Sequence, residues 1–528
     1  MALNYQNLDR AKGYDLLKQM QPLVELDPDR IDAFEIDAGG GLRFNYAAKS
    51  VDGDLLDALA GLAEEQKLLA KYRALASGEI MNTGEGRRVL HHLLRGELSG
   101  SVESDGRNIG GFYTAQRDRF LVFANRIRSG EIKGSTGKPF RHIVQIGIGG
   151  SDLGPRALYL ALKNFGDAEA RRSNLDARFI SNVDPDDPAE VLSEIDIEAT
   201  LFVLVSKSGT TQETLTNRAF VLREMADAPS IDPSKHIVAV TSETSPLAAS
   251  KEVLDSFYID DSIGGRYSAT SAVGGCILSC SLGPDVFARM LRGAHEADLL
   301  ALEDDILKNA PLLDALIGVY ERSILLYPST AVLPYSQALS RLPAHLQQLD
   351  MESNGKRVNR NGDPIDYPTG PVVFGEPGTN GQHSFYQLLH QGTDIVPLQF
   401  VGFKQSQIGV DSAEGEYTSQ EKLNANLAAQ IVAFSTGKND QNPNRSFPGN
   451  RPSSLIYGEK LHPEAVGALL AHFENKVMFQ GFLWNINSFD QEGVQLGKIL
   501  AGSLLDGSGG PELNAYARKL GIDVSKSG

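Results

Sequence analysis

The sequence of 528 residues is poor in cysteine and contains no long run of apolar residues. Its two cysteines, Cys276 and Cys280, cannot provide a disulfide framework for a chain of this length. They lie about one helical turn apart in an apolar stretch, so we expect two buried thiols and a reducing compartment. No window approaches the ~18 apolar residues of a membrane-spanning helix, and residues 1–14 lack the apolar core of a signal peptide. These absences predict a cytoplasmic protein without a membrane anchor.

An excess of positive charge is also absent. The chain has 50 lysines and arginines against 67 aspartates and glutamates, which gives a formal net charge of -17. Nucleic-acid binding depends on basic side chains that neutralise phosphates, so nucleic acid is excluded as the main partner. An anionic substrate would need a local basic pocket. The 41% of hydrophobic and 22% of charged residues are typical of a globular protein, and the length predicts two or three domains.

Motifs for nucleotide cofactors and metals are missing as well. No Gly-Lys-Ser/Thr triplet occurs, which excludes a Walker loop. The glycine-rich segment 147–155 has Asp152 where the dinucleotide fingerprint requires glycine, and a carboxylate there would oppose pyrophosphate. His383 and His390 have no third ligand at the spacing of a zinc site, and the His-Glu-x-x-His motif is absent. We therefore expect neither a cofactor nor a bound metal.

The pattern of apolar residues predicts two α/β units after a mostly helical N-terminal region. Short β-rich runs alternate with helical segments at 142–148, 178–181, 201–205 and 236–241. A helical connector at 297–326 precedes a second series at 330–333, 372–374 and 394–400. Such alternation indicates parallel sheets covered on both faces. The segment 438–454 has the composition of a loop. We expect a helical region at 1–110, subdomains at 111–290 and 291–505, and a C-terminal arm at 506–528.

Hydroxyl and amide side chains dominate residues 206–214, which follow an apolar strand-like run and open a helix-like segment. A helix N-terminus presents unpaired N–H groups and the positive end of the peptide dipole, so it stabilises an anion such as phosphate. Gly209 permits close approach of the backbone to such an anion. The alternative interpretation of this run is an ordinary helix N-cap.

Two further glycine-rich turns carry polar side chains. Segment 147–155 would bring backbone amides and the Ser151 hydroxyl to a small ligand at a sheet edge, or would be a simple strand-to-helix turn. Arg266 follows Gly264 and Gly265, which allow close approach to a ligand. Its permanent charge suits a developing oxyanion, and the alternative is a structural ion pair.

Three segments nearer the C-terminus carry candidate acid–base groups. Glu352 is a candidate general base at the apparent end of a helix, or an ordinary solvated glutamate. His383, near a helix start, could transfer protons at neutral pH, or be a structural histidine. Gln491 and Lys498 would project from one face of a helix, where Lys498 could bind a sugar hydroxyl or phosphate. The alternative there is an amphipathic surface helix.

Taken in order, these segments closely resemble the glucose-6-phosphate isomerase family, with coverage from about residue 90 to 498. Blocks 261–274 and 481–498 are similar to the two signature patterns of the family. Ser208 and Gly209 stand where animal members have Thr-Phe, so the loop resembles that of bacterial members. The resemblance implies two doubly wound, flavodoxin-like sugar-isomerase subdomains with parallel sheets. It also implies N-terminal helices and a C-terminal arm that wrap a homodimer.

The resemblance implies roles for individual residues. Those that would hold the 6-phosphate are Ser206, Lys207, Ser208 and Thr211. Those that would bind the sugar and the phosphate environment are Gly150, Ser151, Gln348 and Gln491. Glu352 would carry the proton between C2 and C1 of the open-chain sugar, and Arg266 would stabilise the negative charge. His383, donated across the dimer interface, would open the ring with help from Lys498.

The activity implied by the resemblance is reversible isomerisation of D-glucose 6-phosphate to D-fructose 6-phosphate. The proton transfer would be metal-free and would pass through a cis-enediol intermediate. A non-catalytic sugar-phosphate sensor would need the 206–214 segment but no base. The residues that together argue against it are Glu352, Arg266, His383 and Lys498. An isomerase that also accepts mannose 6-phosphate stays open, since pocket shape decides it.

Overall fold

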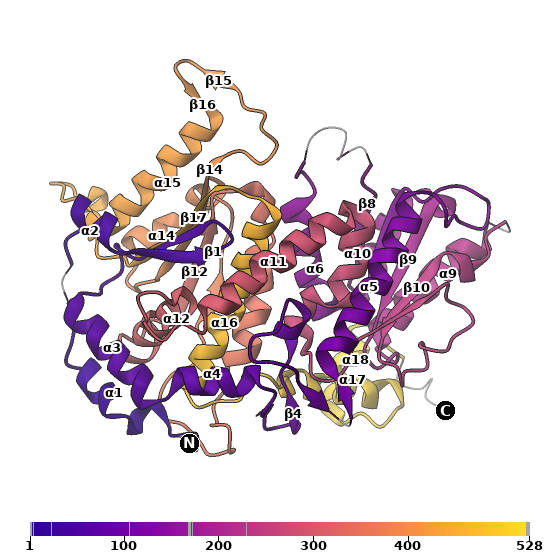
Figure 1. Ribbon diagram of the computed structural model, residues 1–528, viewed down its shortest axis with the longest axis horizontal. Helices are drawn as coiled ribbons and strands as arrows, with labels where there is room; N and C mark the ends of the chain where they lie inside the picture. Colours follow the sequence, from indigo (N-terminus) through magenta and orange to yellow (C-terminus); the bar gives the residue numbers. More distant parts are fainter. Residues whose placement is uncertain are drawn as a thin grey trace. The chain divides into compact units, whose positions relative to one another are not determined.

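The computed structural model describes residues 3, 5–22, 24–104, 106–166, 171, 173–228 and 230–523. Contacts divide the chain into a large unit, Met1–Ser488, and a small C-terminal unit, Phe489–Gly528. Both large sheets belong to the first unit, where they occupy separate regions (Figure 1). No helix among the described residues is long and apolar enough to cross a lipid bilayer. The subdomain boundaries expected at residues 110, 290 and 505 stay predictions.

The first sheet follows the first predicted series of apolar runs. It has five strands in the order β11-β10-β9-β7-β8, and all neighbours are parallel. The strands are β7 (His142–Ile146), β8 (Asp176–Ile180), β9 (Thr200–Val205), β10 (Ile237–Thr241) and β11 (Ser256–Tyr258). Only the short β11 lies outside the predicted runs. β9 and β10 are buried at every position, as in a parallel strand covered on both faces.

Helices pack against this sheet. They are α5 (Ile109–Arg128), α6 (Leu153–Leu162), α8 (Asp186–Ser193), α9 (Gln212–Ala226) and α10 (Ala272–Leu282). Val221 and Met225 of α9 share a buried cluster with Phe202 of β9. α10 is buried along its whole length and contacts β7. Its Cys276 and Cys280 are free and buried, which confirms the expectation for the thiols.

The second sheet has six strands in the order β1-β2-β17-β14-β12-β13. Four are parallel to their neighbours in this part of the sheet: β12 (Ser329–Pro334), β13 (Val372–Phe374), β14 (Leu398–Gln405) and β17 (Ser453–Lys460). β12 and β13 lie where predicted. β14 begins later than the predicted run 394–400, and β17 begins inside the segment 438–454 that composition had assigned to a loop. The predicted class, two α/β cores with parallel strands, is confirmed.

Two strands of this sheet come from the N-terminal region. β1 (Glu35–Gly39) and β2 (Leu42–Asn45) form an antiparallel hairpin, and β2 pairs with β17. A Cβ at Gly40 in the turn would lie 2.5 Å from the carbonyl oxygen of Glu464, so the turn fits there only without a side chain. The helical pattern of 1–110 did not predict these strands, because their partner β17 is remote in the sequence.

The helices of the N-terminal region are α1 (Lys12–Leu17), α2 (Pro28–Ala33), α3 (Gly53–Glu65) and α4 (Leu68–Ala76). The amphipathic stretch 55–75 forms two of them, separated at Lys67, whose φ of 53° is left-handed. Short strand pairs follow: β3 (Ile80–Asn82) with β4 (Arg87–Arg88), and β5 (Glu103–Ser104) with β6 (Arg107–Asn108). Between these pairs, a 3-10 helix (His91–Leu94) is buried at all its positions.

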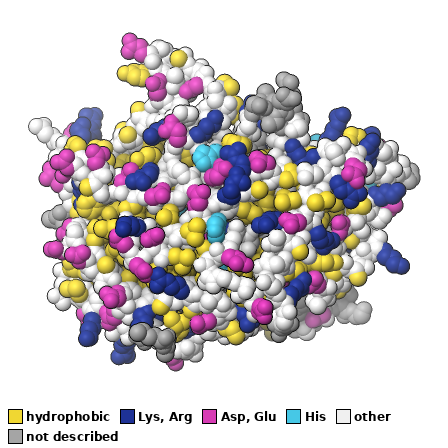
Figure 2. All heavy atoms as spheres, in the orientation of Figure 1, with side chains coloured by type: hydrophobic (Ala, Val, Ile, Leu, Met, Phe, Trp, Pro, Cys, Tyr) yellow, Lys and Arg dark blue, Asp and Glu magenta, His cyan; other side chains and the backbone are white. Residues whose placement is uncertain are grey.

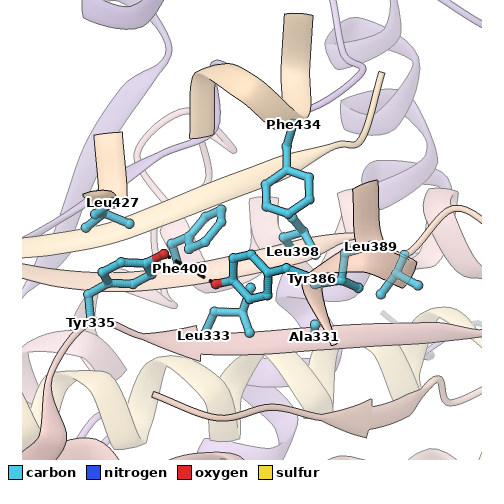
Figure 3. Packing of buried hydrophobic residues seen from close by; sticks show 10 residues of the cluster. Ala331, Leu333, Tyr335, Tyr386, Leu389, Leu398, Phe400, Leu427 and Phe434 are labelled. Atoms are coloured by element: carbon cyan, nitrogen blue, oxygen red, sulfur yellow. Dashed lines mark hydrogen bonds between the residues drawn. The ribbon is translucent and has the colours of Figure 1, made fainter. Parts of the chain in front are cut away.

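The core of the second sheet is rich in aromatic side chains (Figure 3). Phe400 of β14 and Tyr335 lie on the sheet side. Tyr386 of α14 (Tyr386–Gln391) and Phe434 of α15 (Ser419–Thr436) cover them. The hydroxyls of Tyr335 and Tyr386 are 3.4 Å apart, so these buried phenols satisfy each other. Beyond this core, α15 and the hairpin β15 (Ala413–Glu414) to β16 (Tyr417–Thr418) project from the sheet (Figure 1).

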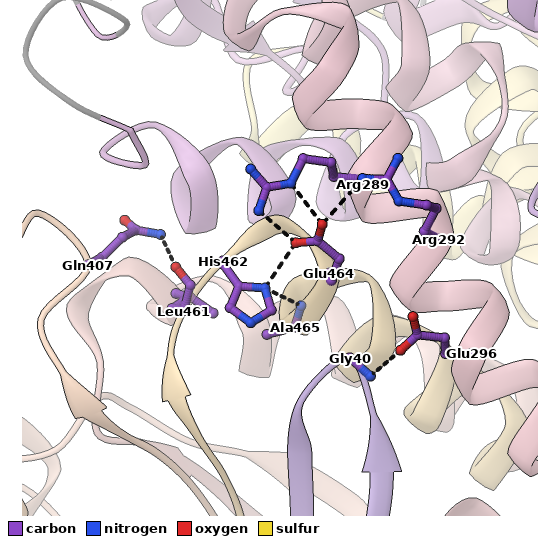
Figure 4. A network of polar contacts seen from close by, with 9 residues as sticks. All are labelled: Gly40, Arg289, Arg292, Glu296, Gln407, Leu461, His462, Glu464 and Ala465. Atoms are coloured by element: carbon purple, nitrogen blue, oxygen red, sulfur yellow. Dashed lines mark hydrogen bonds and ion pairs between the residues drawn. The ribbon is translucent and has the colours of Figure 1, made fainter.

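Two long helices join the sheet regions. α11 (Pro284–Leu300) packs along α16 (Pro463–Leu483), and α12 (Ala310–Val319) also contacts α16. A Cβ at Gly293 would lie 1.9 Å from the carbonyl oxygen of Glu464, so the two helix backbones touch. The Glu464 carboxylate accepts two hydrogen bonds from Arg289, at 2.7 and 2.9 Å, and lies 3.1 Å from His462 Nδ1 (Figure 4).

The small unit, Phe489–Gly528, contains two described helices, α17 (Gln495–Leu505) and α18 (Pro511–Lys519). Several of their apolar side chains are exposed, including Leu496, Ile499 and Tyr516. On the face of the molecule shown in Figure 2, described basic side chains are interspersed with acidic ones and form no continuous basic area.

Candidate active site

The topology of the first sheet brings two of the predicted loops together. The chain passes from β7 to β8 on one side and then to β9 on the other side of β7. The carboxyl ends of β7 and β9 therefore flank the topological switch point, where open α/β sheets bind ligands. Gly147 directly follows β7, and Ser206 directly follows β9.

The loop after β7 lies against the segment that carries Arg266. It forms a 3-10 turn (Gly149–Ser151) before α6, and Arg266 lies in another 3-10 segment (Gly265–Thr270). A Cβ at Gly150 would lie 2.2 Å from the carbonyl carbon of Gly265 and 2.8 Å from the Arg266 nitrogen. This backbone contact requires glycine at position 150. A simple strand-to-helix turn, the alternative interpretation of this segment, would not require this contact.

Gln348 approaches the same loop from the second sheet's half of the chain. A Cβ at Gly149, whose φ is +60°, would be 3.2 Å from Gln348 Nε2. The Oε1 atom of Gln348 is buried and has no hydrogen-bond partner among the described residues. A buried acceptor without a donor is a natural contact for a ligand hydroxyl. The Gln348 side chain thus lies against the turn that contains Gly150 and Ser151.

The loop after β9 is held by its own hydroxyls. Ser206 Oγ and Thr211 Oγ1 are 2.8 Å apart, and the Gly209 N–H donates to Ser206 Oγ at 3.0 Å. Ser208 Oγ accepts from the Thr210 N–H at 3.2 Å. Thr211 is the N-cap of α9, yet its side chain makes no capping hydrogen bond to that helix. The N-terminus of α9 therefore retains donors for an anion, which favours the phosphate interpretation over an ordinary N-cap.

Lys207 points toward the segment that leads into Arg266. Its ammonium donates to the carbonyl of Ile263 at 2.7 Å and lies 3.8 Å from the Asp261 carboxylate. Burial lowers the pKa of Lys207, and the charge of Asp261 opposes this shift. The lysine thus ties the Ser206 loop to the Arg266 segment and adds positive charge near both.

Arg266 is the most completely buried charge of the site. Its side chain has 0% exposure. Its Nε–H donates to Ser353 Oγ at 2.6 Å, and Nη2 donates to the carbonyl of Ser488 at 2.7 Å. Nη1 lies 3.6 Å from Glu352 Oε2. The structure therefore contains the ion pair that sequence reasoning offered as the alternative, and the partner is the candidate base itself.

Glu352 lies at the end of a π-helical turn (Gln347–Glu352) that continues α13 (Leu342–Leu346). Its side chain is only 20% exposed, so it is not an ordinary solvated glutamate. Its Oε2 is buried and makes no hydrogen bond among the described residues, with Arg266 as its ionic neighbour. In the same turn Asp350 is buried, and desolvation raises its pKa to about 6. π-Turns often occur at functional sites.

Sequence reasoning missed the residues that surround this pair. Ser353 and Ser488 contact Arg266, and the Tyr267 hydroxyl lies 3.0 Å from Ser353 Oγ. Ser488 Oγ in turn donates to the side-chain oxygen of Asn354 at 2.8 Å. The available signal was adjacency in the sequence, because Ser353 follows Glu352 and Tyr267 follows Arg266.

Among the described residues, no hydrogen bond or ion pair joins His383 to Glu352. It ends a 3-10 turn (Asn380–His383) before α14, and its side chain is exposed. It makes no hydrogen bond or ion pair with another described residue. His390, in contrast, stacks on Phe434 at 3.7 Å and contacts Gln430 at 2.9 Å, which is a structural role.

Gln491 and Lys498 lie in the small unit, and both are exposed. The expectation that they project from one helix is wrong. Gln491 precedes a 3-10 turn (Glu492–Val494) with φ of -150°, and α17, which carries Lys498, begins only at Gln495. Gln491 is not helical and a 3-10 turn separates it from α17, so the seven-residue spacing does not place both side chains on one face of an α-helix.

Groups of three or more His, Cys, Asp or Glu side chains arranged to hold a metal do not occur in the described part of the chain. The candidate site is built from hydroxyls, backbone amides, one lysine, one arginine and one glutamate. Such a set can bind an anion, fix a negative charge and move a proton.

Comparisons with known proteins agree with this geometry. The family model described as phosphoglucose isomerase matches residues 45–516. The chain is 59% identical to the glucose-6-phosphate isomerase of Treponema denticola over 98% of this chain and 100% of the relative. The corresponding enzyme of Borreliella burgdorferi is 45% identical, over 98% and 99% of the two chains.

A solved structure is similar over almost its whole length. The glucose-6-phosphate isomerase of Chlamydia trachomatis superposes with a TM-score of 0.91 at 41% identity, covering 98% of this chain and 99% of that one. The resemblance inferred from the loops is confirmed. Because the family model spans most of the chain and these relatives match it end to end, the chain belongs to the phosphoglucose isomerase family.

Proposed function

We propose that this chain catalyses the reversible isomerisation of D-glucose 6-phosphate and D-fructose 6-phosphate. The observation that carries the proposal is the partly buried Glu352 carboxylate 3.6 Å from the buried guanidinium of Arg266. A base beside a permanent positive charge is what an aldose–ketose exchange needs. Family membership supports the same activity, since the relatives named above are glucose-6-phosphate isomerases.

The reaction moves one hydrogen between neighbouring carbons of the open-chain sugar. Glu352 removes the proton from C2 of the aldose, the electron pair moves toward the carbonyl oxygen, and O1 takes up a proton to give a cis-enediol. The proton on Glu352 then returns to C1 while the C2 hydroxyl gives up its proton and becomes the ketone, so that the net transfers are one proton from C2 to C1 and one from O2 to O1. Arg266 stabilises the negative charge that develops on oxygen. Acid–base transfer contributes about 10²–10⁴-fold, and one fixed charge on an oxyanion about 10²–10³-fold.

Substrate binding uses the two loops at the switch point. The residues proposed to hold the 6-phosphate are Ser206, Lys207, Ser208 and Thr211. The residues proposed to contact the sugar are Gly150, Ser151, Gln348 and Gln491. The uncapped N-terminus of α9 supports the first group, and the buried, unpaired Gln348 oxygen supports the second.

Ring opening requires a proton donor and acceptor near the ring oxygen. We assign this step to His383 of the partner subunit in a homodimer, assisted by Lys498. The exposure of His383 and the absence of a hydrogen bond or ion pair from it to another described residue are consistent with a role across an interface. The proposed substrates are charged and do not cross membranes unaided, so we place the enzyme in the cytoplasm.

A coupled assay on fructose 6-phosphate tests the activity, with and without a chelator. We expect turnover that the chelator does not change, and loss of activity with chelator would contradict metal-free proton transfer. Glu352→Gln should abolish both isomerisation and solvent exchange of the C2 hydrogen while sugar-phosphate binding survives. Glu303→Gln, an exposed site, is the control.

Retained exchange in the Glu352→Gln variant would remove Glu352 from the mechanism. A wild-type protein that binds sugar phosphates without turnover would instead be the sensor considered above. The same assay with mannose 6-phosphate decides whether that sugar is also a substrate.

A further inference from the structure

Arg266 is oriented by two neighbours that no sequence pattern had singled out. Ser353 Oγ accepts a hydrogen bond from Nε at 2.6 Å, and the Tyr267 hydroxyl lies 3.0 Å from the same oxygen. On the other edge of the guanidinium, the carbonyl of Ser488 accepts from Nη2 at 2.7 Å. Arg266, Tyr267, Ser353 and Ser488 are all buried.

Because the guanidinium is planar, these contacts fix its orientation. Its donors form a rigid fork, so fixing Nε and Nη2 also fixes the direction of Nη1. Nη1 is the atom that lies 3.6 Å from Glu352. Ser353 directly follows Glu352, so one turn carries the candidate base and also holds the candidate oxyanion stabiliser.

The ring of Tyr267 packs against His91, a residue of the N-terminal region. Its ring stacks on His91 with centroids 4.7 Å apart and planes 21° apart. Burial lowers the pKa of His91, and the nearby charge of Arg95 acts in the same direction, so the imidazole is neutral. Arg95 is paired with Asp298 at 3.0 Å and with Glu474. His91 thus supports the Tyr267 ring. The charge of Arg95 is balanced by its two carboxylate partners.

We propose that Ser353 and Tyr267 are positioning residues for the isomerisation, because together they aim the Arg266 guanidinium at the reacting oxygens next to Glu352. The proposal rests on the proposed function. It separates two tasks: the Ser206 loop binds the phosphate, and the Ser353–Tyr267 pair sets the charge that stabilises the enediol.

Single variants test the role. Ser353→Ala removes the acceptor of Nε, and Tyr267→Phe removes only one oxygen atom. A hydrogen bond to a charged group is worth ~1.5–3 kcal/mol, so Ser353→Ala should lower kcat about 10- to 100-fold. The hydrogen bond between the neutral Tyr267 and Ser353 hydroxyls is worth ~0.5–1.5 kcal/mol, so Tyr267→Phe should lower kcat about 2- to 10-fold. The KM should change less than about twofold, because the phosphate loop makes its own hydrogen bonds.

Matched controls exclude a general effect on folding. Ser279 in α10 is as buried as Ser353, and its hydroxyl has no partner among the described residues, so Ser279→Ala should keep full activity. Tyr320 is a buried tyrosine whose hydroxyl donates to the Met20 carbonyl at 2.6 Å, so Tyr320→Phe is the control for Tyr267→Phe. Thermal unfolding of all four variants identifies any that lose structure, and Tyr267→Phe, the smaller change, still tests the idea if Ser353→Ala unfolds.

A double-mutant cycle shows whether Ser353 acts through Arg266. In an Arg266→Lys background, Ser353→Ala should lower kcat less than about twofold further. A full additional loss there, or wild-type kcat in both single variants, would overturn the positioning role while leaving the proposed function intact. Wild-type activity of Arg266→Lys would overturn the role of Arg266 and the positioning proposal together.

Discussion

Each sheet has a topological switch point, but the loops at the two switch points carry different side chains. In the first sheet, the switch lies between β7 and β9, and in the second between β12 and β14, because the chain passes from β12 to β13 on one side and then to β14 on the other. Lys207 and the hydroxyls of its loop follow β9. Amide and hydroxyl side chains follow β12 and β14 most closely, among them Ser336, Gln337 and Gln407, and the first basic residue after β12 is Arg341.

The second sheet contributes to the site in another way. Glu352 lies in the crossover between β12 and β13, at the end of a π-turn, and not at a strand end. The comparison shows that the parallel α/β plan provides a crevice, whereas the side chains decide what the crevice binds. An anion site needs uncapped amides and a nearby cation, and among the described residues the cation stands two residues beyond β9 (Lys207) but seven residues beyond β12 (Arg341).

The largest difference in activity between the two sheet regions should appear when one glycine in each is replaced by alanine. Gly150→Ala would push the Gly265 backbone away, because its Cβ would be 2.2 Å from a carbonyl carbon. Gly402→Ala in β14 would meet the end of the Leu427 side chain at 2.4 Å, which can rotate. We expect kcat/KM to fall at least ~100-fold for the first and less than about twofold for the second. Steady-state assays of both variants decide this, and equal losses would refute the comparison.

A smaller effect should follow from removing hydroxyls at the two switch points. Ser206→Ala with Thr211→Ala deletes the pair at 2.8 Å and should raise the KM for fructose 6-phosphate about tenfold or more. Ser336→Ala with Gln337→Ala, after β12, should leave the KM unchanged. An unchanged KM in the first double variant would remove the phosphate assignment. A raised KM in the second would mean that both crevices bind the substrate.

The smallest effect concerns the helices that join the two sheets. The guanidinium of Arg289 and other hydrogen bonds lower the pKa of Glu464 to about 2 despite partial burial. A carboxylate with a depressed folded pKa adds stability above the unfolded value of ~4.3, and this is lost as pH falls toward 2. Glu464→Gln should therefore lower the free energy of unfolding at pH 7 by about 1–2 kcal/mol and flatten its decline below pH 4.5.

Denaturant titrations at pH 7 and pH 3 measure the Glu464 effect. Glu459→Gln, in an exposed pair with Lys404 at 3.4 Å, is the control and should change the stability by less than ~0.5 kcal/mol. A pH dependence identical to that of the unaltered protein would show that this junction does not depend on the Glu464 charge.

Much of the fold was predictable from local patterns. Buried parallel strands are continuous apolar runs, so β7, β9, β10 and β12 could be found from composition alone. The strands β2 and β17 escaped because they pair with each other across most of the chain, and β17 starts in a segment rich in Asn and Pro. Pairing of remote segments leaves no local periodicity to detect.

The candidate site likewise has features that the sequence could predict and features that it could not. The Ser206 loop was recognisable because its hydroxyls, glycine and following helix are contiguous in the sequence. The contact of Gly150 with Gly265 was not, since it depends on how two loops pack. The prediction of one helix that carries both Gln491 and Lys498 was wrong, because a 3-10 turn lies between Gln491 and the start of α17.

Residue identities alone were therefore sufficient for the α/β class, the candidate phosphate loop and the candidates for base and cation, since each rests on neighbouring residues. Tertiary packing decided the rest: that Arg266 is buried, that its Nη1 faces Glu352, and that Ser353 and Tyr267 hold it there. The physical reason is that burial and the distances between side chains remote in the sequence arise only when the whole core assembles.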